Sequence, residues 1–131
     1  MATVQGPRKV AKLAAGDLSA KQYYIMKLGT TQDQITTCGA NEVAYGILTH
    51  KPDAAGEIAE VWVDGDELKV VSDGSSTNIA IGDRLKSDAN GKAVQIPASQ
   101  TNQNSIGVAL EPSTTDGTII RFRPRFEQID T

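Results

Sequence analysis

Two stretches of this sequence repeat each other and decide the fold. Residues 44–48 read AYGIL and residues 105–109 read SIGVA, with a glycine at the centre of each. A second glycine follows ten residues later in both places, and it leads into EIAEVWV at residues 57–63 and into TIIRFRP at residues 118–124. Apolar and polar side chains alternate in phase in both copies, which is typical of half-buried β-strands. The sequence therefore predicts two related β halves.

Superposing the two copies assigns one face of each strand to the core. The inward positions are Ala59 and Val61 in the first copy and Ile120 and Phe122 in the second, and the outward positions are Glu60 and Trp62, and Arg121 and Arg123. A Gly-Asp bend precedes each copy, at residues 16–17 and 82–83, and we expect each bend to lead into a strand. The halves then span residues 13–72 and 79–126, joined by a turn-rich linker.

Residues 57–71 predict a hairpin centred on Asp64 and Gly65, because these residue types tolerate the positive φ of a two-residue turn. This register would pair Val61 with Leu68 and Ala59 with Val70 on an apolar face. It would also place Glu60 opposite Lys69 as an oppositely charged cross-strand pair.

The length and composition fit one small domain with a modest core. The chain has 131 residues, of which 39% are hydrophobic and 5% aromatic, and chains divide into domains of roughly 100 to 200 residues. We expect a single β domain over residues 13–126, an extended N-terminal arm at residues 1–12 and a tail at residues 127–131. Because few side chains are large, we expect additional burial against partner subunits.

The charge distribution argues against nucleic acid and membranes as partners. The net charge is −3 and the isoelectric point is about 5.1, which disfavours a chain-wide affinity for anionic surfaces. No run of 18 apolar residues occurs, and residues 1–15 lack the apolar region of a signal peptide. The ends are basic and the middle is acidic, which suits subunits that meet head to tail and is also typical of a solvated surface.

The residues that carry chemistry are few. His50 is the only histidine and Cys38 the only cysteine, so a zinc site or catalytic triad lacks members and an internal disulfide is excluded. Residues 64–67 and 88–91 look like calcium-loop fragments, but the hairpin explains the first and the second lacks required ligands. Residues 121–126 alternate arginine with phenylalanine, which we interpret as an exposed stripe over core rings rather than a single-strand binding site. We expect no enzyme activity, metal or cofactor.

The ordered set of motifs resembles the capsid decoration, or cement, proteins of tailed bacteriophages. The resemblance rests on the order and spacing of the Gly-Asp bends, the glycine-centred strands and the closing strand, GTIIRF at residues 117–122, and it covers about residues 10–126. It implies a small mainly β fold of the β-clip or β-barrel kind, similar in style to the lambdoid head decoration protein.

The resemblance also implies a role. Such proteins are made in the host cytoplasm and sit on the outer surface of the virion as homotrimers, at three-fold and quasi-three-fold positions of an expanded capsid. There they bind the major capsid protein and stabilise the shell against the pressure of packaged DNA, without enzymatic activity.

Two sets of candidate site residues follow. The capsid-binding arm contains Val4, Arg8, Lys9, Val10 and Lys12, which would add as a strand to a capsid-protein edge; the alternative is a frayed terminus. The candidate subunit contact contains Trp62, Arg121 and Arg123, since tryptophan and arginine are enriched at interfaces. For Trp62 the alternative is cover beneath another loop or strand.

Two other functions stay open. The polar loop at residues 99–105 would suit a carbohydrate-binding or fibre-like virion module. A nucleotide-hydrolysing enzyme of the β-clip style would need a metal-binding carboxylate and a phosphate-binding motif, neither of which we locate in the sequence.

Overall fold

A computed structural model describes residues 8–97, 100 and 102–129. Within these residues the chain forms ten β-strands and no helix, which confirms the predicted mainly β class. The strands are β1 (Arg8–Ala14), β2 (Ile25–Leu28), β3 (Gln34–Thr37), β4 (Gly46–Leu48), β5 (Ile58–Asp64), β6 (Leu68–Asp73), β7 (Arg84–Ser87), β8 (Ala93–Gln95), β9 (Gln103–Ala109) and β10 (Asp116–Ile129).

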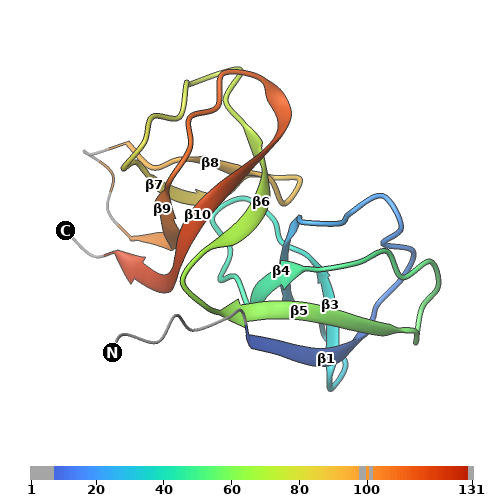
Figure 1. The fold of residues 1–131 in the computed structure, drawn as a ribbon. Coiled ribbons are helices and arrows are strands. Elements are labelled where there is room, and N and C mark those ends of the chain that lie inside the picture. Colours follow the sequence, from blue (N-terminus) through green and yellow to red (C-terminus); the bar gives the residue numbers. More distant parts are fainter. Residues whose placement is uncertain (1–7, 98–99, 101, 130–131) are drawn as a thin grey trace, which may run out of the picture.

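The described strands close into two barrels of identical topology. The first has the strand order β1-β3-β2-β4-β5 and the second β6-β8-β7-β9-β10. In each barrel the first and third strands pair in parallel, and the other pairs are antiparallel. Figure 1 shows the barrels side by side, joined by the passage from β5 to β6. The predicted pseudo-repeat is therefore present, and residues 68–72, which the sequence division placed in the first half, form β6 in the second barrel.

The repeated glycines mark a close approach of two strands in each barrel. Gly46 pairs with Met26, and Gly107 pairs with Leu85. A Cβ atom at Gly46 would overlap the carbonyl oxygen of Trp62, and one at Gly107 would overlap that of Arg123. Glycine is therefore required at both positions because any side chain would meet backbone atoms.

The predicted hairpin around Asp64 and Gly65 is wrong. β5 pairs with β1 and β4, whereas β6 pairs with β10 and β8. Lys69 consequently lies opposite Arg121, not opposite Glu60. The predicted inward residues of both strands are buried, but they lie in different barrels. Each strand gains two neighbours in its own barrel, which satisfies more backbone groups than a lone hairpin would.

The Gly-Asp bends are not equivalent. Asp83 leads directly into β7, but seven residues separate Asp17 from the first residue of β2. The true counterpart of Gly82 is Tyr23. The N–H of Tyr23 donates to Leu48 O at 2.7 Å and that of Gly82 to Ala109 O at 2.8 Å, and both residues have positive φ, 68° and 94°.

Buried side chains form two clusters. One fills the first barrel, with Met26, Ile35 and Leu48 among its members. The other fills the second barrel and extends across the junction, because it includes Ile25 and Ile47 of the first barrel. The junction between the barrels is therefore part of the hydrophobic core.

Backbone hydrogen bonds also cross the junction. Val71 donates to Tyr23 O at 2.9 Å, and Ile25 donates to Gly91 O at 2.8 Å. Residues 23–25 thus bridge β6 and the turn before β8. In the first barrel the matching atoms, the N–H of Leu13 and the O of Asp33, bond to each other at 2.8 Å instead.

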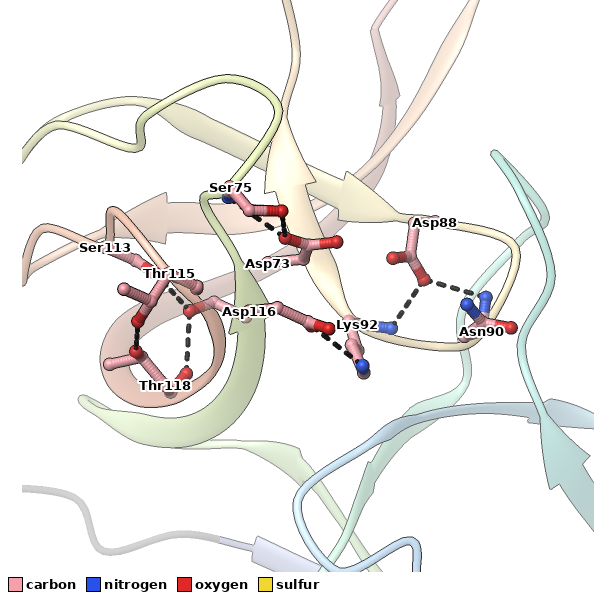
Figure 2. A network of polar contacts seen from close by, with 10 residues as sticks. Asp73, Ser75, Asp88, Asn90, Lys92, Ser113, Thr115, Asp116 and Thr118 are labelled. Atoms are coloured by element: carbon pink, nitrogen blue, oxygen red, sulfur yellow. Dashed lines mark hydrogen bonds and ion pairs between the residues drawn. The ribbon is translucent and has the colours of Figure 1, made fainter.

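A polar network orders the β7–β8 turn and ties it to β10 of the same barrel (Figure 2). The Asp88 carboxylate accepts the N–H groups of Asn90 and Lys92 at 2.8 and 2.9 Å, and Lys92 Nζ lies 2.8 Å from Asp116 Oδ1. A Cβ at Gly91 would lie 2.5 Å from Thr37 Cγ2. The turn therefore needs a glycine at the point where it presses on the first barrel.

Candidate functional site

The candidate arm is mostly a barrel strand. Val4 lies outside the described residues, but Arg8, Lys9, Val10 and Lys12 belong to β1 and pair with β5. Arg8 and Lys9 are exposed, and Val10 packs against the core of the first barrel. The expected free arm is therefore corrected for residues 8–12, because the alternation of this segment buries one of its faces in the barrel.

Lys12 uses its charge within the molecule. Its Nζ lies 5.4 Å from the centre of the Tyr45 ring and 3.4 Å from Asp33 Oδ1. Its stem lies opposite buried Ala59. Arg8 and Lys9 are therefore the cations of this strand that are available to a partner.

One edge of β1 is open over most of its length. Residues 8–13 pair with β5 on one side, whereas β3 pairs only with Leu13 and Ala14 on the other. Within the described residues, the second edge of residues 8–12 has no paired strand. An unpaired strand edge offers backbone donors and acceptors to a strand of another protein.

Trp62 lies at the junction between the barrels of one chain. It is half-buried against the core cluster of the second barrel, and its ring stacks on Tyr23 with centroids 5.7 Å apart and planes at 10°. Its Nε1 atom is buried and has no hydrogen-bond partner in the described part of the chain.

Arg121 and Arg123 lie on β10 with exposed side chains. Arg121 Nε is 3.1 Å from Glu111 Oε1, and one terminal nitrogen is 3.2 Å from Glu67 Oε1. The hydrogen bond to Glu111 raises the pKa of Arg121, and the backbone N–H of Arg121, followed by its side chain, lowers the pKa of Glu111. Arg123 lies opposite Val108, as Trp62 lies opposite Ile47. Trp62 and Arg123 therefore occupy equivalent positions in the two barrels.

Six exposed apolar residues in the described part of the chain were not predicted as candidate site residues from the alternation of the strands. Each is between 39% and 72% exposed. They are Leu13, Leu28, Val43 and Ile58 in the first barrel and Ile81 and Ile119 in the second. Ile58 and Ile119 each precede a residue that was predicted to face inward, so both should face outward. An apolar residue at an outward position could have identified them from the sequence. Single exposed apolar residues are common on protein surfaces, but Leu13 and Ile58 lie opposite each other on β1 and β5 and form a contiguous pair, which is a candidate contact surface.

A surface hollow beside the end of β2 suits protein contact better than catalysis. It has a volume of about 370 Å³ and is lined by residues 27–28 and 42–45. Its charged groups are Lys27 and Glu42, which are 2.8 Å apart, and the hydrogen bonds from Lys27 and from the N–H of Gly39 lower the pKa of Glu42. A paired carboxylate of lowered pKa is a poor general base at neutral pH.

The two residues weighed for nucleophilic chemistry have other partners. Cys38 is buried and its Sγ lies 3.5 Å from Glu42 O, and burial raises the pKa of its thiol. His50 Nε2 lies 3.0 Å from Ile58 O. No group of three or more His, Cys, Asp or Glu side chains that could hold a metal occurs in the described parts of the chain. Nor is there, among the residues that were placed, a helix long and apolar enough to cross a membrane.

Comparison with solved structures identifies a similar fold. The structure of the N-terminal base of head fiber gp8.5 in bacteriophage phi29 matches with a TM-score of 0.70 and 17% sequence identity, over 95% of this chain and 98% of that one. At this identity the match concerns the fold alone. No curated protein matches the sequence.

The sequence itself matches a family model. The model describes a phage cement protein and covers residues 10–124, which include all of barrel one from Val10 onward and barrel two to Pro124. That family consists of structural proteins and not of enzymes. The chain therefore belongs to the phage cement protein family, as a capsid-associated structural protein of a bacteriophage virion.

Proposed function

We propose that this protein binds the outer surface of an expanded phage capsid at three-fold and quasi-three-fold positions. Its partner there is the major capsid protein, three copies sit at each position, and their binding stabilises the shell against the pressure of packaged DNA. Membership of the cement protein family supports the capsid as partner. The finer points rest on the surfaces of the molecule.

The observation that carries the proposal is the open edge of β1. On this edge, residues 8–12 offer backbone groups that no other described strand pairs with, beside the exposed side chains of Arg8 and Lys9. A strand of the capsid protein that pairs along this edge gains hydrogen bonds worth about 1 kcal/mol each. Such a strand would connect the cement protein to the shell without a deep pocket.

Reversing the charge of this edge tests the proposal. The variant Arg8→Glu with Lys9→Glu should keep its fold, because both side chains are exposed, and should bind expanded capsids at least ten-fold more weakly in cosedimentation. Lys51→Glu is the matched control, since Lys51 is an exposed cation in the β4–β5 loop at the opposite end of the first barrel. Equal binding by the double variant and the control would overturn the role of this edge.

Deleting residues 2–12 is a poorer test than charge reversal. The deletion would remove most of β1 and take Val10 away from the core of the first barrel. Loss of capsid binding would then report loss of the fold.

A fibre-like virion module is the second candidate. The observation that favours it is the similarity of fold to the phi29 head fiber base. The polar loop at residues 99–105, from which a carbohydrate-binding function was predicted, lies partly outside the described residues. Binding of the purified protein to a glycan array, together with no binding to expanded capsids, would favour this candidate over the cement role.

A further inference from the structure

We propose that copies of this chain associate head to tail, with the turn before β7 of one copy packed on β1 and β5 of the next. This inference rests on the proposed trimer and names its contact. The contact between the two barrels of one chain suggests the contact between copies, because the two barrels have the same topology.

Inside one chain, the turn before β2 packs on a cross-strand pair of the second barrel and buries one of its members, Val71. Val71 and Ile119 face each other on β6 and β10. Gln22 and Tyr24 of the first barrel line the same hollow of about 270 Å³ as this pair, and Val71 donates its N–H to Tyr23 O. Val71 is consequently only 7% exposed.

The equivalent pair in the first barrel has no such cover. Strand registers match Leu13 to Val71 and Ile58 to Ile119, because each pair lies opposite on the first and last strands of its barrel. Leu13 is 39% exposed and Ile58 is 64% exposed. Figure 1 places β1 at the bottom of the first barrel, away from the second barrel. The difference is largest between Leu13 and Val71: the chain covers Val71 with its own turn and leaves the equivalent Leu13 exposed.

The turn that would cover this pair is also available and apolar. The turn at residues 80–83 of the second barrel corresponds to residues 21–24, as the matched bonds of Gly82 and Tyr23 show. Its Ile81 takes the place of Gln22 and is 68% exposed. The isoleucine at the tip of this turn and the Leu13–Ile58 pair of another copy are all apolar, so they can bury one another at the core of a contact.

A second matched contact supplies charge complementarity. Inside the chain Ile25 donates to Gly91 O. The counterpart of Ile25 is Arg84, since both open the second strand of a barrel and lie opposite Ile47 and Val108. The counterpart of Gly91 is Asp33, which shares its positive φ, 63° against 83°. Arg84 is exposed and makes no ion pair within the described residues. The Asp33 side chain lies 3.4 Å from Lys12 Nζ but is 59% exposed, so it can still be reached by a second cation.

These matches favour a second copy over the capsid as the occupant of the Leu13–Ile58 surface. Each side of the contact lies on a different barrel, so the contact is heterologous, and repeated heterologous contacts close into a ring when the rotation allows. Three copies would give a ring of six barrels. The contact between copies is made by side chains, because the N–H of Leu13 and the O of Asp33 already bond to each other.

Cysteine cross-linking tests this contact. In a Cys38→Ser background, chains with Ile58→Cys and chains with Ile81→Cys are mixed and treated with a short bismaleimide, both free and on expanded capsids. We expect linked dimers from the mixture and none from either chain alone. A chain with both substitutions should give species of up to three copies. Ile119→Cys mixed with Ile81→Cys is the matched control: Ile119 is exposed, but it should not link, because residues 22–24 of its own chain already occupy the place beside Val71 and Ile119 that an incoming turn would need.

Two results would overturn the contact. Linking of Ile58→Cys chains to one another would indicate a two-fold contact, and no linking of the mixture on capsids that carry normal amounts of protein would assign the surface to another occupant. Capsid cosedimentation of the same samples separates the two proposals. Binding without linking contradicts only the head-to-tail contact, whereas linking without binding contradicts only the capsid role. Arg84→Glu, placed in the Ile81→Cys chain, should also reduce the linked fraction several-fold while it leaves the fold intact, because Arg84 is exposed.

Discussion

The two barrels share every strand pairing but differ in the partners of one pair of backbone N–H and C=O groups. In the first barrel, Leu13 and Asp33 bond to each other across β1 and the turn before β3. In the second barrel, the matching Val71 and Gly91 bond to Tyr23 and Ile25 of the first barrel. Both barrels are closed by their own strands, but at this position the first barrel satisfies its own backbone groups and those of the second are satisfied by the first. A repeated fold can therefore have one barrel that docks and one that receives.

The outward faces of the barrels differ in the same sense. Ile25, Ile47 and Trp62 of the first barrel pack against the core cluster of the second. Their counterparts are Arg84, Val108 and Arg123, of which both arginines are exposed. The apolar face is used inside the chain, and the basic face remains at the surface.

Exchanging one residue between these faces should give the largest effect. Ile25→Arg buries an unpaired charge at the junction and should lower the free energy of unfolding by about 3 to 5 kcal/mol. The reverse exchange, Arg84→Ile, should change it by less than about 0.5 kcal/mol because Arg84 is exposed. Urea unfolding followed by circular dichroism measures both. Equal losses would contradict the asymmetry of the two faces.

The paired glycines should give the next effect. Gly107→Ala forces a Cβ onto a carbonyl oxygen at a φ of 149°, whereas Gly46→Ala meets a carbonyl without positive φ. We expect losses of about 3 and about 1 to 2 kcal/mol, respectively, in the free energy of unfolding. A larger loss for Gly46→Ala than for Gly107→Ala in chemical denaturation would contradict the prediction that Gly107 is the more constrained of the two glycines.

The equivalent outward residues Trp62 and Arg123 should separate stability from assembly. Trp62→Ala loses the stack on Tyr23 and should cost about 2 kcal/mol, whereas Arg123→Glu should leave thermal unfolding nearly unchanged. Light scattering of both variants then tests the candidate subunit contact. If both retain the mass of the parent assembly, neither residue contributes to that contact.

The sequence predicted the faces of the strands better than their partners. The alternation around Ala59, Val61, Ile120 and Phe122 correctly indicated buried residues, because burial follows from side-chain period alone. The pairing failed at Asp64 and Gly65, since a turn signal is local whereas barrel closure is set by distant strands such as β1 and β10.

The junction was hidden from the sequence for a different reason. Tyr23 adopts the positive φ that Gly82 adopts in the other barrel, so a search for a second Gly-Asp bend selected Gly16 and Asp17. The candidate basic residues at Arg8 and Lys9 could be predicted from charge, but the barrel that contains them could not. The exposed Ile58 and Ile119 were visible as breaks in the alternation.

Acid should have the smallest effect and should affect both barrels. Asp17 and Glu42 in the first barrel and Asp73 and Glu111 in the second have pKa values lowered mainly by hydrogen bonds to their carboxylates. A lowered folded-state pKa contributes stability at neutral pH that is lost as the pH falls through that pKa. The urea concentration at the unfolding midpoint should therefore decrease when the pH is lowered below about 4. Asp73→Asn should make this decrease smaller. A midpoint independent of pH would contradict these assignments.

Imaging of decorated capsids tests the central claim most directly. Purified protein is added to undecorated expanded heads, and the particles are examined by electron cryomicroscopy. The two-barrel chain should appear at three-fold and quasi-three-fold positions as three copies, with six barrels around each axis and the Arg8 end of β1 against the shell. Absence of added density, or density confined to other positions, would contradict the account.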